Sequence, residues 1–142
     1  MKSLDFAILF THMKLKDYES WFVLKPKLHS ADPSRHVNAR DIWWCSIGIN
    51  IGHEMDGKSG KASRPVLVLR KLSAYTFVGL PLTSKEKMGS WYVPITIHRK
   101  VSRVILSQVR VFDVRRLTTK IAQLDTKDFK EVRKRFIEFY SS

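Results

Sequence analysis

The chain has 142 residues and a formal net charge of +13, with 26 Lys and Arg against 13 Asp and Glu. Hydrophobic residues make up 44% of it and glycine and proline are sparse, which excludes a disordered chain and predicts one globular core. The excess of positive charge favours nucleic acid, an acidic protein or an anionic membrane as a partner. The single cysteine, Cys45, excludes an internal disulfide and is typical of a reducing compartment.

We expect neither a membrane span nor an export signal at the start of the chain. Its longest apolar run, Phe6–Phe10, is too short to span a membrane, and no small-residue cleavage site follows it as in a signal peptide. We therefore expect a cytoplasmic protein. Met13 is a plausible alternative start, so residues 1–12 are expected to contribute little to the fold.

Residues 1–39 are predicted to form an N-terminal extension, ahead of a barrel domain at residues 40–142. Asp17–His29 has a partly amphipathic helical pattern, with the apolar residues Trp21, Phe22, Leu24 and Leu28. Pro26 removes a backbone donor, so we expect it to kink or end this helix. Ala31–Arg40 contains Asp, Pro, Ser and Asn, which is typical of a linker.

The first strand is predicted at Asp41–Ile47, which is rich in aromatic and branched side chains. Alternation along a strand places Trp43 and Trp44 on opposite faces of the sheet. One of them is expected in the core, and the other at a partner subunit or on the surface. A loop that contains several glycines, Gly48–Ser63, follows.

A hairpin is predicted from the apolar runs Val66–Leu69 and Thr76–Leu82, which a polar turn around Lys71–Ala74 joins. The start of one strand and the end of the next lie at the same edge of a hairpin. Arg64 and Thr83 should therefore be neighbours in space. A cation beside a hydroxyl, in a chain this basic, indicates a site that handles phosphate.

Short strands and a final helix complete the chain. The strands are predicted at Trp91–Ile97, Val104–Leu106, Val109–Val114 and Thr119–Leu124. Pro94 confines its strand to a sheet edge or a bulge. Asp125 or Thr126 can cap the helix, and Asp128 lies in its first turn, where negative charge is favourable. The apolar stripe of the helix is Phe129, Val132, Phe136, Ile137 and Tyr140.

The segment Gly52–Ser59 reads G-H-E-M-D-G-K-S and satisfies the phosphate-loop pattern G-x-x-x-x-G-K-[ST]. That loop binds phosphate because a helix starts at its Lys-Ser, so that the helix N-terminus faces the phosphates. Here Gly60, Ala62, Ser63 and Pro65 follow, and then a strand. No helix can start where the mechanism needs one, so nucleotide binding at this loop is disfavoured.

Metal and thiol chemistry find little support in the sequence. Five histidines are present, but none is spaced with another His, Cys or carboxylate as in a metal motif. The adjacent pair His53 and Glu54 is isolated, and neighbours in a loop rarely converge on one ion. We predict no metal and no cofactor, and we interpret Cys45 as an inert core thiol.

The order of motifs is more specific than any one of them. The chain reads R-D-I-W-W-C-S-I-G, then G-H-E-x-D-G, R-P-V-L-V-L, P-L-T-S and I-L-S-Q-V-R-V-F-D-V-R-R-L. Over Arg40–Tyr140 this succession resembles the MazF/PemK (Kid) family of toxins from toxin–antitoxin systems. The resemblance implies a mostly β, SH3-like barrel of the MazF/PemK/CcdB type with a C-terminal helix, which forms homodimers. It also implies a metal-independent endoribonuclease that cuts single-stranded messenger RNA, and an acidic antitoxin as partner.

The resemblance assigns roles to particular residues. It implies that Arg64 of R-P and Thr83 of P-L-T-S are the principal catalytic pair, and that His53 corresponds to the histidine of G-H-E. Residues implied or proposed to bind RNA are Ser107, Gln108, Arg110, Ser84, Glu54, Lys58, Lys61 and Lys85. The basic segments Lys58–Lys61 and Lys85–Lys87, together with Trp91 and Tyr92, are further candidates for the surface that binds bases.

The chain departs from the family pattern at three places. Ser107 and Ile105 stand where several relatives carry an acidic residue and some an arginine, so the acid–base scheme of that branch cannot be transferred whole. The Gly48–Ser63 loop has an extra basic G-K-S-G-K segment. The extension lies outside the common pattern.

The expected reaction is attack of the RNA 2′-hydroxyl on the adjacent phosphorus, which leaves a 2′,3′-cyclic phosphate and a 5′-hydroxyl. Arg64 would stabilise the developing charge and Thr83 would bind a non-bridging oxygen. His53 is preferred as base or acid because imidazole exchanges protons near neutral pH. Two alternatives stay open: a non-catalytic nucleic-acid-binding barrel, and a toxin of the same fold that poisons DNA gyrase, as CcdB-like proteins do, through its C-terminal helix.

Overall fold

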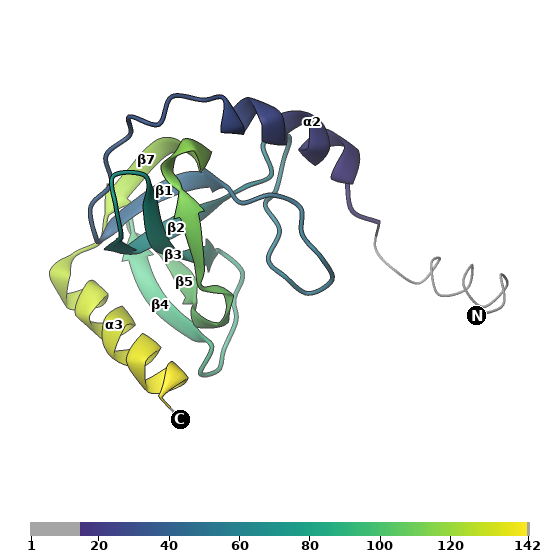
Figure 1. Ribbon diagram of the computed structural model, residues 1–142. Helices are drawn as coiled ribbons and strands as arrows, with labels where there is room; N and C mark the ends of the chain where they lie inside the picture. The colour runs from purple at the N-terminus through teal and green to yellow at the C-terminus, as the bar shows by residue number, and fades with distance from the viewer. Residues whose placement is uncertain (1–14, 142) are drawn as a thin grey trace, which may run out of the picture.

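The computed structural model describes residues 15–141, so the run Phe6–Phe10 and the possible start at Met13 lie outside the described residues. A curled antiparallel sheet forms the body of the molecule, and helices α2 and α3 lie at its opposite ends (Figure 1). The helices are α2 (Tyr18–His29) and α3 (Thr126–Tyr140). The strands are β1 (Asp41–Ser46), β2 (Ser63–Lys71), β3 (Thr76–Thr83), β4 (Tyr92–Ile97), β5 (Lys100–Ile105), β6 (Arg110–Asp113) and β7 (Leu117–Gln123). Two 3₁₀ turns, η1 (Leu106–Gln108) and η2 (Val114–Arg116), flank β6.

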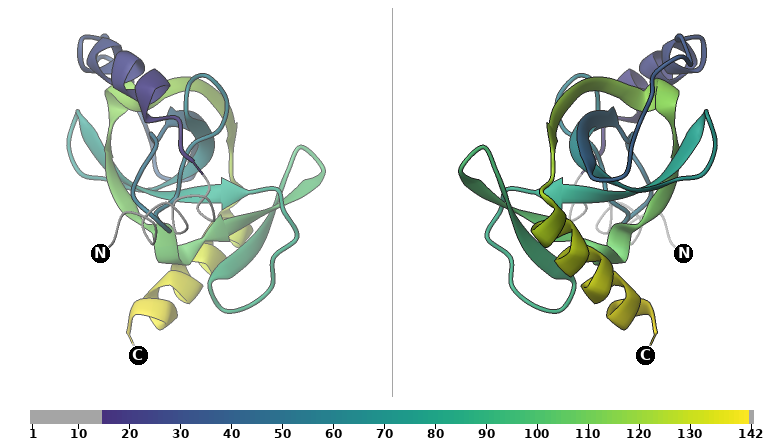
Figure 2. Two further views of the ribbon diagram at one scale, coloured as in Figure 1. Left: turned by 90° about the vertical axis from the view of Figure 1, so that its right-hand side faces the viewer. Right: turned by 90° about the vertical axis from the view of Figure 1, so that its left-hand side faces the viewer.

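The sheet curls because β3 has different partners at its two ends. The strand order is β4-β5-β3-β2-β1-β7, and β6 pairs with β3 outside this path. The first half of β3 pairs with β6, with Phe77 opposite Phe112, whereas its end pairs with β5, with Leu82 opposite Val104. The β4–β5 hairpin extends from the body as an arm (Figure 2). This architecture confirms the predicted mostly β fold with flanking helices.

The two faces of the sheet bury two separate hydrophobic clusters. Along β2, Leu67 belongs to one cluster and its neighbours Val66 and Val68 to the other, as alternation requires. Helix α3 covers the first cluster with Phe129 and Val132. The second cluster comprises Val37, Trp43, Cys45, Ile47, Val66, Val68, Phe77, Phe112, Val114 and Leu117.

Several predictions about single residues are confirmed. Trp43 is buried, whereas Trp44 on the opposite face is 42% exposed. Pro94 lies in β4, which is the last strand of the sheet order. Asp125 caps α3 by accepting a hydrogen bond from the Asp128 N–H at 2.7 Å.

Three expectations need correction. Pro26 does not end α2, which continues to His29, because a proline costs a helix one hydrogen bond and the last turn forms without it. The alternative, a kink at Pro26, stays a prediction. Phe22 of the expected apolar pattern is 78% exposed, and Trp21 is the residue of this helix that is buried. The strand expected at Val104–Leu106 begins earlier, at Lys100, and ends at Ile105. No helix within residues 15–141 is long and apolar enough to cross a membrane.

Candidate functional site

The predicted hairpin brings Arg64 and Thr83 together. Strands β2 and β3 are antiparallel, and their pairing ends with Val66 opposite Pro81, two residues from Arg64 and from Thr83. Both residues line a pocket of about 280 Å³ at this edge of the sheet. Ser84 and Lys58, two of the predicted RNA-binding residues, line it as well.

Trp44 also lines this pocket, although the sequence analysis had not assigned it to the site. Strand β1 pairs with β2, and Trp44 lies opposite Pro65, next to Arg64. Its partly exposed ring lines the pocket, as does Ser102 from β5. Alternation in β1 had indicated that one tryptophan faces outward, but the pairing with Pro65 was needed to place it here. An indole at this position offers a flat surface on which a base can stack.

Arg64 is half-buried and held by the loop that precedes its strand. Its Nε donates a hydrogen bond to the backbone carbonyl of Asp56. Burial lowers the pKa of Arg64 below its ordinary value, and the nearby charge of Asp56 opposes this effect. One edge of the guanidinium is thus occupied, which fixes its direction while the remaining N–H groups can bind phosphate.

Thr83 is the second residue of the predicted catalytic pair, and it is buried. It is only 8% exposed, and its Oγ1 accepts a hydrogen bond from the Lys85 N–H at 3.2 Å. A threonine hydroxyl that accepts such a bond still has its own hydrogen to donate. The Lys85 side chain is exposed beside the pocket. Thr83 can therefore donate a hydrogen bond to an anion beside Arg64.

A second pocket brings together three more of the predicted RNA-binding residues. Glu54, Gln108 and Arg110 line a hollow of about 450 Å³, together with Pro81, which precedes Thr83 by two residues on the same strand face. The Met55 N–H donates to Gln108 Oε1 at 3.0 Å. The two pockets therefore lie along one strand.

Two arginines are anchored at the end of β1: Arg110, which lines the second pocket, and Arg116, which lines a separate hollow beneath α2. Arg110 Nη1 donates to the Ile47 carbonyl at 3.0 Å, and its guanidinium lies 4.9 Å from the centre of the Phe112 ring. Arg116 Nη1 donates to the Ser46 carbonyl at 3.0 Å. Burial, and next the charge of Arg110, lower the pKa of Arg116. Two like charges held this close favour an anion nearby, and the sequence had not singled out Arg116.

Other sequence candidates lie outside both pockets. His53 is exposed on the loop between β1 and β2, and it lines neither pocket, although its neighbour Glu54 lines the second. Lys61 is exposed and Ser107 is half-buried, and neither lines a pocket of the site. The same is true of Trp91 and Tyr92.

The phosphate-loop match does not have the structure that its mechanism needs. Residues after Lys58 form turns, and β2 begins at Ser63, so no helix starts there. Within residues 15–141 no group of three or more His, Cys, Asp or Glu is placed to hold a metal ion. Cys45 is buried, which raises the pKa of its thiol to about 12. It lies opposite Arg64 in the register of β1 and β2.

The chain is similar to solved toxin structures. A crystal structure of MazF from Deinococcus radiodurans is 25% identical, with a TM-score of 0.62 over 76% of this chain and 99% of that one. A MazE–MazF structure from the same organism is 21% identical, with a TM-score of 0.56 over 75% and 97%. An endoribonuclease in complex with its cognate antitoxin, from a mycobacterial species, is 9% identical, with a TM-score of 0.57 over 75% and 96%.

Family membership rests on a match over most of the chain. None of the curated proteins compared with the chain matches it. The profile of the family described as "PemK-like, MazF-like toxin of type II toxin-antitoxin system" matches residues 38–140. These residues include both pockets and every strand of the sheet. The chain therefore belongs to the PemK-like, MazF-like toxins of type II toxin–antitoxin systems.

Proposed function

We propose that this toxin is an endoribonuclease that cuts single-stranded messenger RNA at short sequences and leaves 2′,3′-cyclic phosphate and 5′-hydroxyl ends. The observation that supports this most directly is that Arg64 and Thr83 line one pocket at the same edge of the sheet. The reaction needs no metal because RNA supplies its own nucleophile. Toxins of this family are generally endoribonucleases, which fits the proposal.

Arg64 would stabilise the transition state. Attack of the 2′-oxygen on phosphorus forms one P–O bond and breaks the bond to the 5′-oxygen, and negative charge gathers on the non-bridging oxygens between these events. A guanidinium carries a permanent charge and several donors in one plane, which suits two phosphate oxygens. The hydrogen bond from Arg64 to the Asp56 carbonyl sets the plane in advance, so little reorganisation is needed as charge develops.

Thr83 would fix the scissile phosphate, and His53 would transfer protons. The Thr83 hydroxyl donates to a non-bridging oxygen and holds the phosphorus in line with the 2′-oxygen. The 2′-proton leaves to a base and the departing 5′-oxygen receives one from an acid. We propose His53 for one of these steps, acting from the loop beside Glu54, because imidazole is suited to both.

RNA would extend along β3 across both pockets. Trp44 offers a stacking surface at the first pocket, and Gln108 offers donors and acceptors to base edges at the second. Arg110 and Arg116 would bind backbone phosphates, and Lys58, Lys61 and Lys85 would add to the positive field around the path. Binding should therefore weaken as the salt concentration rises.

An acidic antitoxin would compete for the same basic surface. Solved MazE–MazF complexes share this fold, and we propose by analogy that this toxin also forms a homodimer and binds its own antitoxin. The net charge of +13 favours an acidic peptide that orders on the toxin as it binds. Such a peptide should displace RNA.

The test is incubation of the purified chain with a long single-stranded RNA in excess EDTA. Discrete fragments with 5′-hydroxyl ends, absent with Arg64→Ala and Thr83→Ala, would support the proposal, whereas 5′-phosphate ends would contradict internal attack. Intact RNA that stays bound would favour a non-catalytic binding barrel. Toxicity that persists in Arg64→Ala, together with inhibited gyrase, would favour a gyrase poison.

A further inference from the structure

The N-terminal extension is tied to the loop between β1 and β2. Lys16 Nζ donates to the carbonyls of Asn50 and Gly52 at 2.6 and 2.9 Å, and forms an ion pair with the Asp56 carboxylate at 3.0 Å. The Tyr18 hydroxyl donates to the Asn50 carbonyl at 2.9 Å. An ammonium group has three donors, so Lys16 uses all of them on this one loop.

The same loop also contacts two residues of the candidate site. The Asp56 carbonyl accepts the hydrogen bond from Arg64 Nε, and the Met55 N–H donates to Gln108. The Asp56 carboxylate also accepts from the Asn50 N–H at 2.6 Å. The Asp56 residue therefore contacts Lys16 with its side chain and Arg64 with its backbone.

The contact between extension and loop is partly withdrawn from water. The side chains of Lys16 and Asp56 are 17% and 26% exposed, so their attraction is screened less than that of an open surface pair. Helix α2 also packs on the base of the loop, where the Trp21 ring lies so close to Gly48 that a Cβ there would be 2.6 Å from it. Arg116 lies on the Trp21 ring, 5.7 Å from its centre.

We propose that Lys16 is a positioning residue for Arg64: it acts through Asp56 to hold the guanidinium in the direction that the reaction needs. This inference rests on the ribonuclease activity proposed above. It gives residues 15–29, which precede the part of the chain that matches the family, a role in the site rather than beside it. Lys16 itself does not line either pocket of the site.

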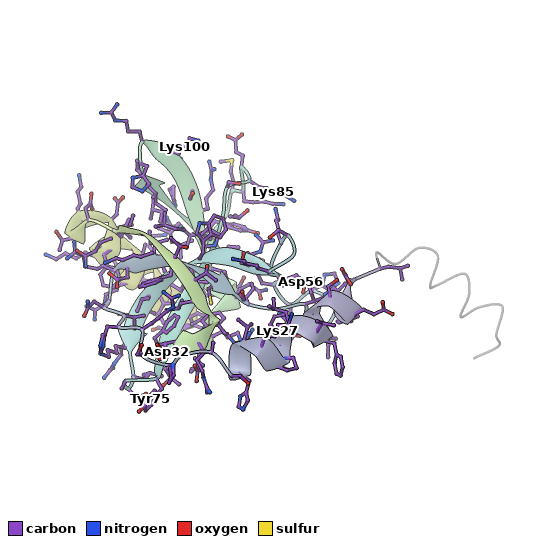
Figure 3. All side chains as sticks on the ribbon, turned by 90° about the horizontal axis from the view of Figure 1, so that it is seen from above. Lys27, Asp32, Asp56, Tyr75, Lys85 and Lys100 are labelled. Atoms are coloured by element: carbon purple, nitrogen blue, oxygen red, sulfur yellow. The ribbon has the colours of Figure 1, made fainter. Side chains whose placement is uncertain are left out.

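The first experiment compares Lys16→Met with Lys27→Met in the full chain. Lys16 directly precedes α2 and Lys27 is exposed near the other end of that helix, whereas Asp56 lies near the end of α2 where the described chain begins (Figure 3). Initial cleavage rates are measured against the concentration of a long single-stranded RNA. Lys16→Met is expected to lower kcat on the order of tenfold or more with KM nearly unchanged, because a misdirected group slows the chemical step. Lys27→Met is expected to match the wild type, and Lys16→Arg to restore most of kcat.

A second background separates positioning from general damage. In Arg64→Lys the side chain has no Nε–H for the Asp56 carbonyl, so adding Lys16→Met should cost much less than it does in the wild type. An equal cost in both backgrounds would overturn the proposal. So would a Lys16→Met protein whose kcat equals that of Lys27→Met.

Hydrogen exchange keeps the inference separate from the proposed function. If the wild type does not cut RNA, the ribonuclease proposal fails. The effect of Lys16 on the loop between β1 and β2 is then judged from amide exchange at residues 50–57. Faster exchange in Lys16→Met but not in Lys27→Met would support control of this loop by Lys16, and equal exchange would overturn it.

Discussion

The candidate site has two halves that are held in different ways. Arg64 and Thr83 lie on β2 and β3, and backbone pairing within the sheet holds both. Arg64 pairs with Cys45 of β1, and Thr83 pairs with Arg103 of β5. Glu54, Met55 and Asp56 lie on a loop instead. The side chains of Lys16 and Gln108, which are distant in sequence, hold this loop through hydrogen bonds to Asp56 and Met55. Backbone pairing depends on the alternation of apolar and polar residues and tolerates most single side-chain changes. The loop depends on a few side-chain hydrogen bonds. Substitutions should therefore affect the two halves differently.

The largest effect should come from the strand half, at Arg64. Arg64→Ala removes the charge that we propose to stabilise the transition state, and it should lower kcat/KM on the order of a thousandfold or more. Arg70→Ala is the matched control, because Arg70 lies exposed at the far end of the same strand. Cleavage rates on one RNA measure both. Equal losses in the two variants would show that the general positive charge matters and not the position.

Thr83 should have a smaller effect of the same kind. Thr83→Ala removes one donor to the phosphate and is expected to lower kcat on the order of a hundredfold, whereas Thr83→Ser keeps the hydroxyl and should retain most activity. Single-turnover cleavage with excess enzyme separates this loss from a change in RNA binding. A Thr83→Ser protein as slow as Thr83→Ala would point to packing of the methyl group instead.

A substitution at Gly79 tests how closely the strand half is packed, through the free energy of unfolding. A Cβ at Gly79 would lie 2.6 Å from Val66 Cγ1 and 2.9 Å from the Phe112 ring, all within strand-held structure. Gly79→Ala should lower the free energy of unfolding by about 1–3 kcal/mol through overpacking. Gly60→Ala on the loop is the control, because a Cβ at Gly60 meets nothing within 4 Å. Urea unfolding of the two variants compares them, and equal midpoints would contradict close packing at Gly79.

The smallest effect concerns pH and the thiol beside Arg64. Burial raises the pKa of Cys45 to about 12, from about 9 for an unperturbed thiol, so the fold favours the neutral form. This contribution is complete below pH 9 and is lost as the pH rises from 9 to 12. By pH 10, one unit above the ordinary thiol pKa, about 1 kcal/mol of this contribution has been lost. The free energy of unfolding should therefore fall more steeply between pH 8 and 10 in the wild type than in Cys45→Ala, and parallel curves would contradict it.

The strand half was predictable from sequence because its geometry follows from alternation and register. Two apolar runs and a turn place Arg64 and Thr83 at one edge, and adjacent tryptophans must face opposite sides. The place of Trp44 in the pocket was not predictable in this way. It depends on the pairing of β1 with β2, across a loop whose length does not set the register.

The loop half could not be read from sequence because it is built from long-range hydrogen bonds. Asp56 meets Arg64 through its backbone carbonyl, which every residue has, so nothing in the residue type announces the contact. Lys16 looked like one of many surface lysines on a very basic chain. The motif G-H-E drew attention to His53, yet its neighbours Glu54 and Met55 line the second pocket and His53 does not.

The single cysteine also gives the toxin a built-in reporter. Cys45 is the only thiol of the chain, it is buried, and it lies opposite Arg64 in the pairing of β1 with β2. A thiol reagent can reach it only when the sheet opens at this point, so the rate of labelling counts those openings. RNA or antitoxin bound at the pockets should slow that rate without any added dye or tag. Occupancy of the site could thus be followed by mass spectrometry, even in the Arg64→Ala and Thr83→Ala proteins.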